Sequence, residues 1–303
     1  WALIAGLTWF KSRKAIMLEE DRRTEILFLG LATLYAFIIP LKGSLAWYDG
    51  LVLVSLYVWY INLVRKRPVQ EVELDGPAQY LIRLAPLKRR LATASMFLFS
   101  AGVILADAEL FSEGLIGTGK ALGINEFLLV QWLAPIASEA PEFTVAIMLT
   151  LRGQAGAALG SLLSAKLNQW TLLVSMIPMV FGISAGTFSQ PLPMNAFQMN
   201  EILLTAAQSL LAVGFLASMR LTPLAGFVLF ILFTGQLAEP AFCDFFQALF
   251  PGLCGSTKIH LAFSITYLVL ALGTIAVQPK KVVELWAGAK PKFLVGPKTQ
   301  SAN

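Results

Sequence analysis

The feature that most constrains this chain is a series of apolar runs, each about 20 residues long, which recur along almost its whole length. About 20 helical residues cross the hydrocarbon core of a bilayer, and a backbone in lipid must satisfy its own polar groups, so these runs are helices. After a truncated run at 1–10, spans are predicted near 22–41, 45–64, 91–117, 126–151, 155–183, 199–218, 221–238 and 258–277. The fold class that follows is all-α, a polytopic transmembrane helix bundle.

Composition supports this fold class, because 57% of the residues are hydrophobic and only 14% are charged, against about 25% charged in soluble proteins. One sizeable loop and a short tail are left for water, so we expect no separate soluble domain. Trp1 opens the chain inside an apolar run, with neither a starting Met nor a signal-peptide n-region. We therefore expect the sequence to begin partway through a longer protein.

Lysine and arginine residues are concentrated in alternate loops. Nineteen of the 23 lie in segments 11–23 and 65–90, at Arg152 and Arg220, and in the tail after residue 278. The other loops hold three, and Lys166 lies inside a predicted span. By the positive-inside rule, the basic loops and the C-terminus lie in the cytoplasm of a multi-pass protein, which we expect in a bacterial inner membrane. The charge is scattered beside apolar spans, so the lipid bilayer is an expected partner and nucleic acid is not. The sequence leaves the oligomeric state open.

An internal repeat appears at an offset of 176 residues. Glu-Ile-Leu at 25–27 returns at 201–203, and Gly50 returns as Gly226. One period contains five spans, and an odd number of spans makes the second copy enter the membrane from the opposite side. The sequence therefore predicts inverted-topology five-helix repeats, an arrangement that secondary transporters use with their sites at the midplane.

The same offset divides the chain into parts. Residues 1–64 are predicted to be the remnant of a first repeat unit, 65–90 a cytoplasmic linker, 91–238 the second unit, and 239–303 an extra loop, an added transmembrane helix and a cytoplasmic tail. The first copy of the charged helix pair described next would lie upstream of Trp1. We therefore expect the first repeat to be incomplete and this part of the protein to be inactive alone.

Ionisable residues lie near mid-span in two consecutive predicted helices. Glu139 and Glu142 fall in the first, and Lys166, with Asn168 and Gln169, falls in the second. Such groups are costly at bilayer depth and by default mark an ion or substrate path. One lysine cannot neutralise two carboxylates, so a spare carboxylate would hold a proton or bind a cation. Exchange of one for the other is antiport chemistry.

Helical spacing places these side chains on shared faces. Ser138, Glu139 and Glu142 are three and four positions apart, and Lys166 and Gln169 are three apart. A short connection between the two spans would make them antiparallel neighbours with the charges at matching depth. A purely structural Glu–Lys pair that locks the two helices together is the alternative.

Proline and small residues add to this pattern. Pro141 inside a helix removes a backbone bond and frees carbonyls beside the carboxylates, which suits a hard cation. Between Gly153 and Ser161, glycine and alanine predominate. Small residues let helix backbones approach closely in lipid, so packing is favoured there over a direct role as ligands.

A family resemblance follows from two stretches. Residues 137–142 read Ala-Ser-Glu-Ala-Pro-Glu, and after a Gly-containing turn residues 158–169 read Ala-Leu-Gly-Ser-Leu-Leu-Ser-Ala-Lys-Leu-Asn-Gln. This pair resembles the second alpha-repeat of the cation/calcium exchanger superfamily. That family typically shows Gly-Thr-Ser-Leu-Pro-Glu in the first helix and Gly-Ser-Asn-x-x-Asn or Gly-Ser-Asp-x-x-Asn in the second. The resemblance implies exchange of Ca²⁺ or a related cation against Na⁺ or H⁺ by alternating access, with inorganic cations as partners and no cofactor.

The resemblance also assigns the site. Glu142 falls on the family's central cation-ligating glutamate and Ser138 on the threonine before the ligating serine, whereas Glu139, Lys166 and Gln169 depart from the motif. An ammonium only donates and cannot coordinate a cation, so we predict a Glu139–Lys166 pair beside a site centred on Glu142. The predicted cation-binding residues are Glu142 (the metal ligand), Ser138, Glu139, Gln169 and Asn168, and the predicted site-modulating residues are Lys166 and Pro141.

Two other functions remain as alternatives. A transport-inactive structural or regulatory membrane protein would use the Glu139–Lys166 pair to lock its helices. An intramembrane enzyme would use the two glutamates as acids or metal ligands, but the sequence has no His-Glu-x-x-His motif and its single histidine, His260, lies at the edge of a span. We therefore do not expect an enzyme.

The two cysteines fall in one outward loop. Cys243 and Cys254 would lie on the side that is oxidising in a bacterial periplasm, so a disulfide that closes a small loop is possible. Two unpaired thiols are the alternative.

Overall fold

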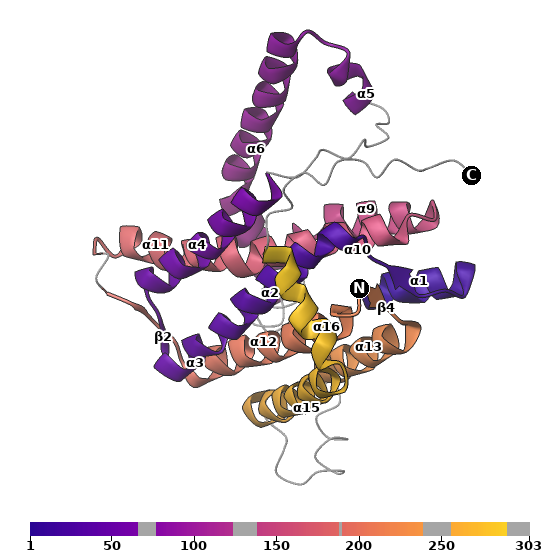
Figure 1. Ribbon diagram of the computed structural model, residues 1–303. Coiled ribbons are helices and arrows are strands. Elements are labelled where there is room, and N and C mark those ends of the chain that lie inside the picture. Colours follow the sequence, from indigo (N-terminus) through magenta and orange to yellow (C-terminus); the bar gives the residue numbers. More distant parts are fainter. Residues whose placement is uncertain (66–76, 124–137, 188–189, 239–255, 290–303) are drawn as a thin grey trace, which may run out of the picture. The chain divides into compact units, whose positions relative to one another are not determined.

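The computed structural model describes residues 1–65, 77–123, 138–187, 190–238 and 256–289. Helices account for nearly all of the regular structure in these ranges (Figure 1). The chain divides into two compact units, one formed by residues 1–67 with 144–303 and the other by residues 68–143.

The elements follow one another in this order: α1 (Ala2–Ser12), β1 (Ile16–Met17), η1 (Glu20–Arg22), α2 (Arg23–Ala36), α3 (Ile38–Lys42), β2 (Ser44–Leu45), α4 (Trp47–Val64), α5 (Pro77–Ile82), α6 (Pro86–Ala121), α9 (Ala140–Leu151), α10 (Ala155–Asn168), η3 (Gln169–Leu173), α11 (Val174–Ser184), β3 (Leu192–Pro193), α12 (Ala196–Leu216), β4 (Arg220–Leu221), α13 (Pro223–Ala238), α15 (Ser256–Val277), α16 (Pro279–Glu284) and η5 (Leu285–Ala289). The predicted helix bundle is confirmed.

Six helical segments within the described ranges are long and apolar enough to cross a membrane: Glu20–Lys42, Trp47–Val64, Pro86–Ala121, Ala155–Ser184, Ala196–Leu216 and Lys258–Val277. They match six of the predicted spans within a few residues. The helices α9 and α13 are shorter apolar helices at the other predicted positions. The first part of the predicted span 126–151, up to residue 137, lies outside the described residues.

The element order repeats with the offset predicted from the sequence. Adding 176 to the bounds of β1 and β2 gives the bounds of β3 and β4 without any residual shift. The same addition brings α1 onto α11, α2 onto α12 and α4 onto α13, with ends that differ by a few residues. The described part of the chain therefore contains two copies of one supersecondary unit.

The strand pairing shows how the two copies are related. β1 pairs antiparallel with β4, with Ile16 opposite Leu221, and β2 pairs antiparallel with β3, with Leu45 opposite Leu192. In the repeat, Leu192 is the equivalent of Ile16 and Leu45 is the equivalent of Leu221, so each strand pair is the counterpart of the other. Reciprocal contacts of this kind are what a two-fold relation between copies produces. This confirms the inverted-topology repeat.

Backbone geometry beside the strands follows the same relation. The N–H of Leu18 donates to the carbonyl of Met219 at 2.9 Å, and the N–H of Met194 donates to the carbonyl of Gly43 at 3.2 Å. Gly43 and Met219, the two acceptors, both have positive φ angles, 68° and 57°. Met219 adopts a conformation that glycine adopts more easily, because the repeated turn before the strand requires it.

Helices of one copy pack against helices of the other. α1 lies against α13, α11 lies against α4, and α2 lies against α12 at the centre of this unit (Figure 1). Two equivalent glycines allow the outer contacts. A Cβ atom at Gly50 would lie 2.7 Å from the carbonyl oxygen of Ser175, and one at Gly226 would lie 2.5 Å from the Cβ of Ala5.

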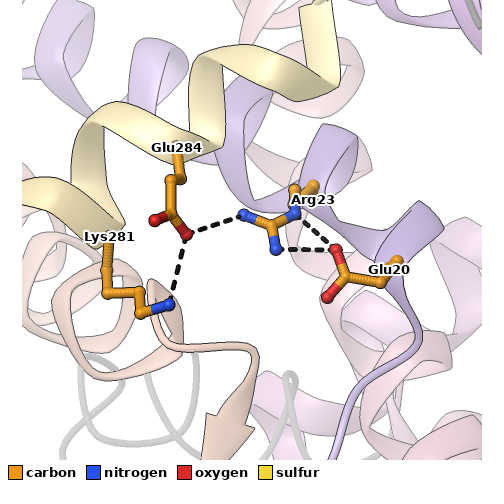
Figure 2. Close-up of polar contacts among 4 residues, drawn as sticks. All are labelled: Glu20, Arg23, Lys281 and Glu284. Atoms are coloured by element: carbon orange, nitrogen blue, oxygen red, sulfur yellow. Dashed lines mark hydrogen bonds and ion pairs between the residues drawn. The ribbon is translucent and has the colours of Figure 1, made fainter.

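The last helices attach to this repeat pair. α15 packs along α12, and α16 and η5 return to the start of α2. Figure 2 shows the polar part of this attachment, in which Arg23 lies between Glu20, at 2.6 Å, and Glu284, at 3.6 Å. Lys281 lies 3.3 Å from the same carboxylate of Glu284. Leu285, 3% exposed, fills the apolar core beside these charges.

Candidate ion-binding site

The first predicted site segment lies where α9 begins. Ser138 is exposed, and the carbonyl of the half-buried Glu139 accepts the N–H of Phe143 at 3.0 Å. Pro141 is the second residue of α9, where a helix has no use for the missing N–H, so it is compatible with the helix start. The carbonyl that Pro141 would free one turn earlier belongs to residue 137, which lies outside the described residues.

Glu142 is the third residue of α9 and is half-buried. A carboxylate in the first turn is stabilised by the helix dipole. Its Oε2 atom is buried and has no hydrogen-bond partner in the part of the chain that the structure describes. Buried polar atoms are usually hydrogen-bonded, so this oxygen needs an explanation, and binding of a cation or a proton would provide one.

The connection to the second site segment is short, as predicted. Gly153, with a φ angle of 87°, lies between the end of α9 and the start of α10. On α10, a Cβ atom at Gly156 would lie 2.5 Å from the carbonyl oxygen of Met17, and one at Gly160 would lie 2.9 Å from the guanidinium of Arg22. The small residues therefore allow close packing, which confirms the favoured interpretation.

Lys166 lies on the last turn of α10 and is half-buried, Asn168 is exposed, and Gln169 is half-buried. The ammonium of Lys166 lies 5.8 Å from the centre of the Trp170 ring. Directly after Asn168 the helix changes to a π turn, Gln169–Leu173. Such turns occur frequently at functional sites.

Part of the chain, including both site segments, is similar to a known family of proteins. The family model described as sodium/calcium exchanger protein matches residues 92–238. The H⁺/Ca²⁺ exchanger CAX, whose crystal structure is known, is 41% identical to this chain in sequence. The structural match has a TM-score of 0.84 and covers 95% of this chain and 70% of that chain. The chain belongs to the cation/calcium exchanger superfamily. It is a multi-pass integral membrane protein.

Two further proteins are similar to this chain at lower identity. An uncharacterized membrane protein of Methanocaldococcus jannaschii is 25% identical over 167 residues, which are 54% of this chain and 51% of that protein. The match thus spans about half the length of this curated relative. A structure of the sodium-calcium exchanger NCX_Mj is 21% identical, with a TM-score of 0.49 over 78% of this chain and 72% of that one.

Other buried carboxylates of this superfamily member have fixed partners. Asp49 is fully buried and accepts hydrogen bonds from the hydroxyl of Tyr35 at 2.6 Å, from the N–H of Ala46 at 2.8 Å and from the ammonium of Lys42. No sequence motif indicated this cluster, because its members come from the end of α2, from α3 and from the start of α4. Asp49 is therefore neutralised by the protein itself.

Glu25 and Glu201, which are equivalent in the repeat, also have partners. Glu25 is 4% exposed and lies 3.3 Å from the guanidinium of Arg22 and 3.5 Å from the hydroxyl of Tyr60. Glu201 contacts the Nδ1 atom of His260, which is 4% exposed. One oxygen each of Glu25 and Glu142 is buried without a hydrogen-bond partner in the described part of the chain. Glu142 differs from Glu25 and Glu201 because its carboxylate forms no ion pair among the described residues.

The π turn was missed by sequence reasoning, although two signals for it exist. Pro178 cannot donate to the carbonyl of Val174 and so disturbs the helix that follows the turn. The hydroxyls of Thr171 and Ser175 donate to the carbonyls of Leu167 and Leu172 at 2.7 Å each. Side-chain bonds of this kind near a proline accompany irregular helical hydrogen bonding.

Other predicted residues are not brought together by the described structure. Ser138, Glu139 and Glu142 belong to the unit of residues 68–143, whereas Lys166 and its neighbours belong to the other unit. The Glu139–Lys166 pair therefore stays a prediction. Within the described residues, His, Cys, Asp and Glu form no group of three or more that could hold a metal ion. The predicted disulfide of Cys243 and Cys254 lies outside the described residues.

Proposed function

We propose that this protein is a secondary active cation antiporter that exchanges Ca²⁺ or a related cation against Na⁺ or H⁺ by alternating access. Its site is centred on Glu142. The observation that carries the proposal is the buried Oε2 atom of Glu142, which has no hydrogen-bond partner in the described part of the chain. Membership of the exchanger superfamily supports cation transport, and the relative that is 41% identical is an H⁺/Ca²⁺ exchanger. We therefore propose Ca²⁺ and H⁺ as the first ions to test.

In this mechanism Glu142 alternates between a cation-bound and a cation-free, neutralised state. Ca²⁺ takes six to eight oxygen ligands, so a single carboxylate needs help from other oxygens. Ser138, Glu139, Asn168 and Gln169 are the proposed sources. When the cation leaves, a bare carboxylate at this depth is unfavourable, and a proton or Na⁺ takes its place. The site is then never left charged without a counter-ion, which couples the two fluxes.

Lys166 has a separate role in this proposal. It stands where the superfamily has a ligating amide or carboxylate, and its fixed positive charge excludes a second metal ion from that position. We propose that it pairs with Glu139, so that Glu142 is the carboxylate left for the mobile ions. The ion preference then depends on where the ammonium lies.

The inverted repeat supports alternating access. Two copies of one unit with opposite orientation can exchange conformations, which opens the site first to one side of the membrane and then to the other. We propose the orientation given by the positive-inside rule, with the basic loops and the C-terminus in the cytoplasm, in a bacterial inner membrane. An ion gradient drives the exchange, so the mechanism needs no cofactor and no enzymatic step.

The test is Ca²⁺ uptake into vesicles that contain the purified full-length protein, driven by an outward gradient of H⁺ or Na⁺. The variant Glu142→Gln keeps the shape of the side chain and removes its charge. We expect its uptake to fall to the background of empty vesicles. Glu113→Gln, on an exposed position of α6, is the matched control and should retain uptake.

Two results would count against the proposal. Uptake at the normal rate in Glu142→Gln would remove this residue from the mechanism. No uptake with any gradient in the unsubstituted full-length protein would favour the transport-inactive alternative, in which the Glu139–Lys166 pair is only structural.

A further inference from the structure

We propose that Trp170 is a positioning residue that fixes the ammonium of Lys166, and that Ser209 on α12 holds the Trp170 ring in place. This inference rests on the proposed function, in which Lys166 belongs to the ion site. It adds two residues that no motif contains and links the ion site to the centre of the repeat pair. All three residues belong to the same compact unit.

The contact between Lys166 and Trp170 carries the first step. The ammonium lies 5.8 Å from the centre of the ring, within the distance of about 6 Å at which a cation is attracted to the face of an indole. Lys166 is half-buried and Trp170 is 5% exposed. Less water competes for the ammonium at such a place than at a surface, so the position of the ring influences where the charge lies.

The bond between Trp170 and Ser209 carries the second step. Nε1 of Trp170 donates to Oγ of Ser209 at 2.9 Å, and both residues are buried. The indole has one N–H group, so this bond and the packing around the ring fix its orientation. Because Ser209 is 39 positions away, on a helix in the centre of the unit, the ring is tied to the scaffold and not only to its own helix.

The local backbone makes such an anchor useful. Trp170 is the second residue of the π turn Gln169–Leu173, and Lys166 lies on the regular helix before it. A π turn disturbs the usual angular spacing of side chains around a helix. Regular helix geometry therefore determines the direction of a side chain less strictly inside the turn. The bond to Ser209 supplies that direction from outside.

The repeat provides a comparison for Ser209. Its equivalent on α2, at an offset of 176, is Thr33, which is fully buried and whose Oγ1 has no hydrogen-bond partner among the described residues. The packing of α2 against α12 therefore accepts a buried hydroxyl without a partner at this position. The bond from Trp170 to Ser209 is an addition to that packing, and Thr33 provides a matched control.

The test measures Ca²⁺ uptake into vesicles as a function of Ca²⁺ concentration and of pH for Trp170→Phe, Ser209→Ala, Ser209→Thr and Thr33→Ala. We expect Trp170→Phe and Ser209→Ala to shift the half-saturating Ca²⁺ concentration about twofold to tenfold, the effect of one lost hydrogen bond. Both should move the pH profile in the same direction. Ser209→Thr, which keeps the hydroxyl, and Thr33→Ala should behave like the unsubstituted protein.

A second set of variants separates positioning from simple packing. In a Lys166→Gln background the ammonium is absent, so Trp170→Phe and Ser209→Ala should no longer shift the profile. Effects of the same size in that background would overturn the inference, because residues that act through one another are not additive. If Trp170→Phe does not fold, Ser209→Ala decides the question, since it removes only one oxygen atom.

The outcome also separates this inference from the proposed function. Loss of uptake in Glu142→Gln, together with unchanged profiles in Trp170→Phe and Ser209→Ala, would refute the positioning role and keep the antiporter. Absence of uptake in the unsubstituted protein would overturn both.

Discussion

Lys166 is the residue at which this chain departs most from the motif of its superfamily. A basic group stands at a position where an oxygen ligand is expected, and it lies beside an indole ring instead of being fully exposed. In the proposed site, a positive charge at this position would act on a cation that binds nearby.

We expect Lys166→Asn to change the ion preference or the proton dependence of transport, because an amide restores an oxygen ligand and removes a fixed positive charge. Ca²⁺ uptake measured with Na⁺ and pH varied one at a time checks this. Lys120→Asn, outside the predicted site, is the control. A transport profile identical to that of the unsubstituted protein would reduce Lys166 to a structural role.

At the scale of single residues, the sequence identified the charges but not their partners. Glu139, Glu142 and Lys166 were recognisable because ionisable groups are rare in apolar spans. The hydrogen bond from Trp170 to Ser209 was not recognisable in the sequence. It depends on the relative rotation of two helical segments that are distant in the chain. Hydropathy and spacing contain no information about that rotation.

Among the elements, α4 and α13 occupy equivalent places in the repeat and use equivalent glycines. Gly50 and Gly226 leave room for α11 and α1, respectively. The contact at each glycine is closer than a side chain would allow. The two glycines therefore hold the two copies together in the same way.

We expect Gly50→Ala and Gly226→Ala each to lower the stability of the protein by about 1–3 kcal/mol, the usual cost of overpacking. The melting temperature in detergent, measured by thermal unfolding, checks this. Gly6→Ala on α1 is the matched control, because nothing lies within 4 Å of the position that its Cβ would take. Equal melting temperatures for all three variants would show that the glycine contacts do not support the packing.

The helices themselves were largely predictable, and their interruptions were not. Runs of apolar residues gave the positions of α2, α4, α12 and α15 within a few residues. The change from α10 to a π turn at Gln169 does not alter hydropathy, which is averaged over about 20 residues. The change depends on the carbonyl to which each backbone N–H donates, and the packing of neighbouring helices determines that carbonyl.

For the whole molecule, the inverted repeat was visible in the sequence as an offset of 176 residues, and the structure reproduces that offset in helices and strands. The strand pairs that join the two copies were not predicted, because a strand of two residues is too short to show alternation. Two copies joined in this way have the symmetry that alternating access requires, and the proposed mechanism depends on it.

The most direct test of the central proposal, that mobile ions take turns at Glu142, is Ca²⁺ binding to the purified protein by titration calorimetry at two pH values, with and without Na⁺. We predict that the apparent affinity for Ca²⁺ falls when the concentration of H⁺ or of Na⁺ is raised, and that Glu142→Gln binds no Ca²⁺ at this site. Ca²⁺ binding that neither H⁺ nor Na⁺ weakens, or that survives in Glu142→Gln with the same affinity, would contradict the proposal.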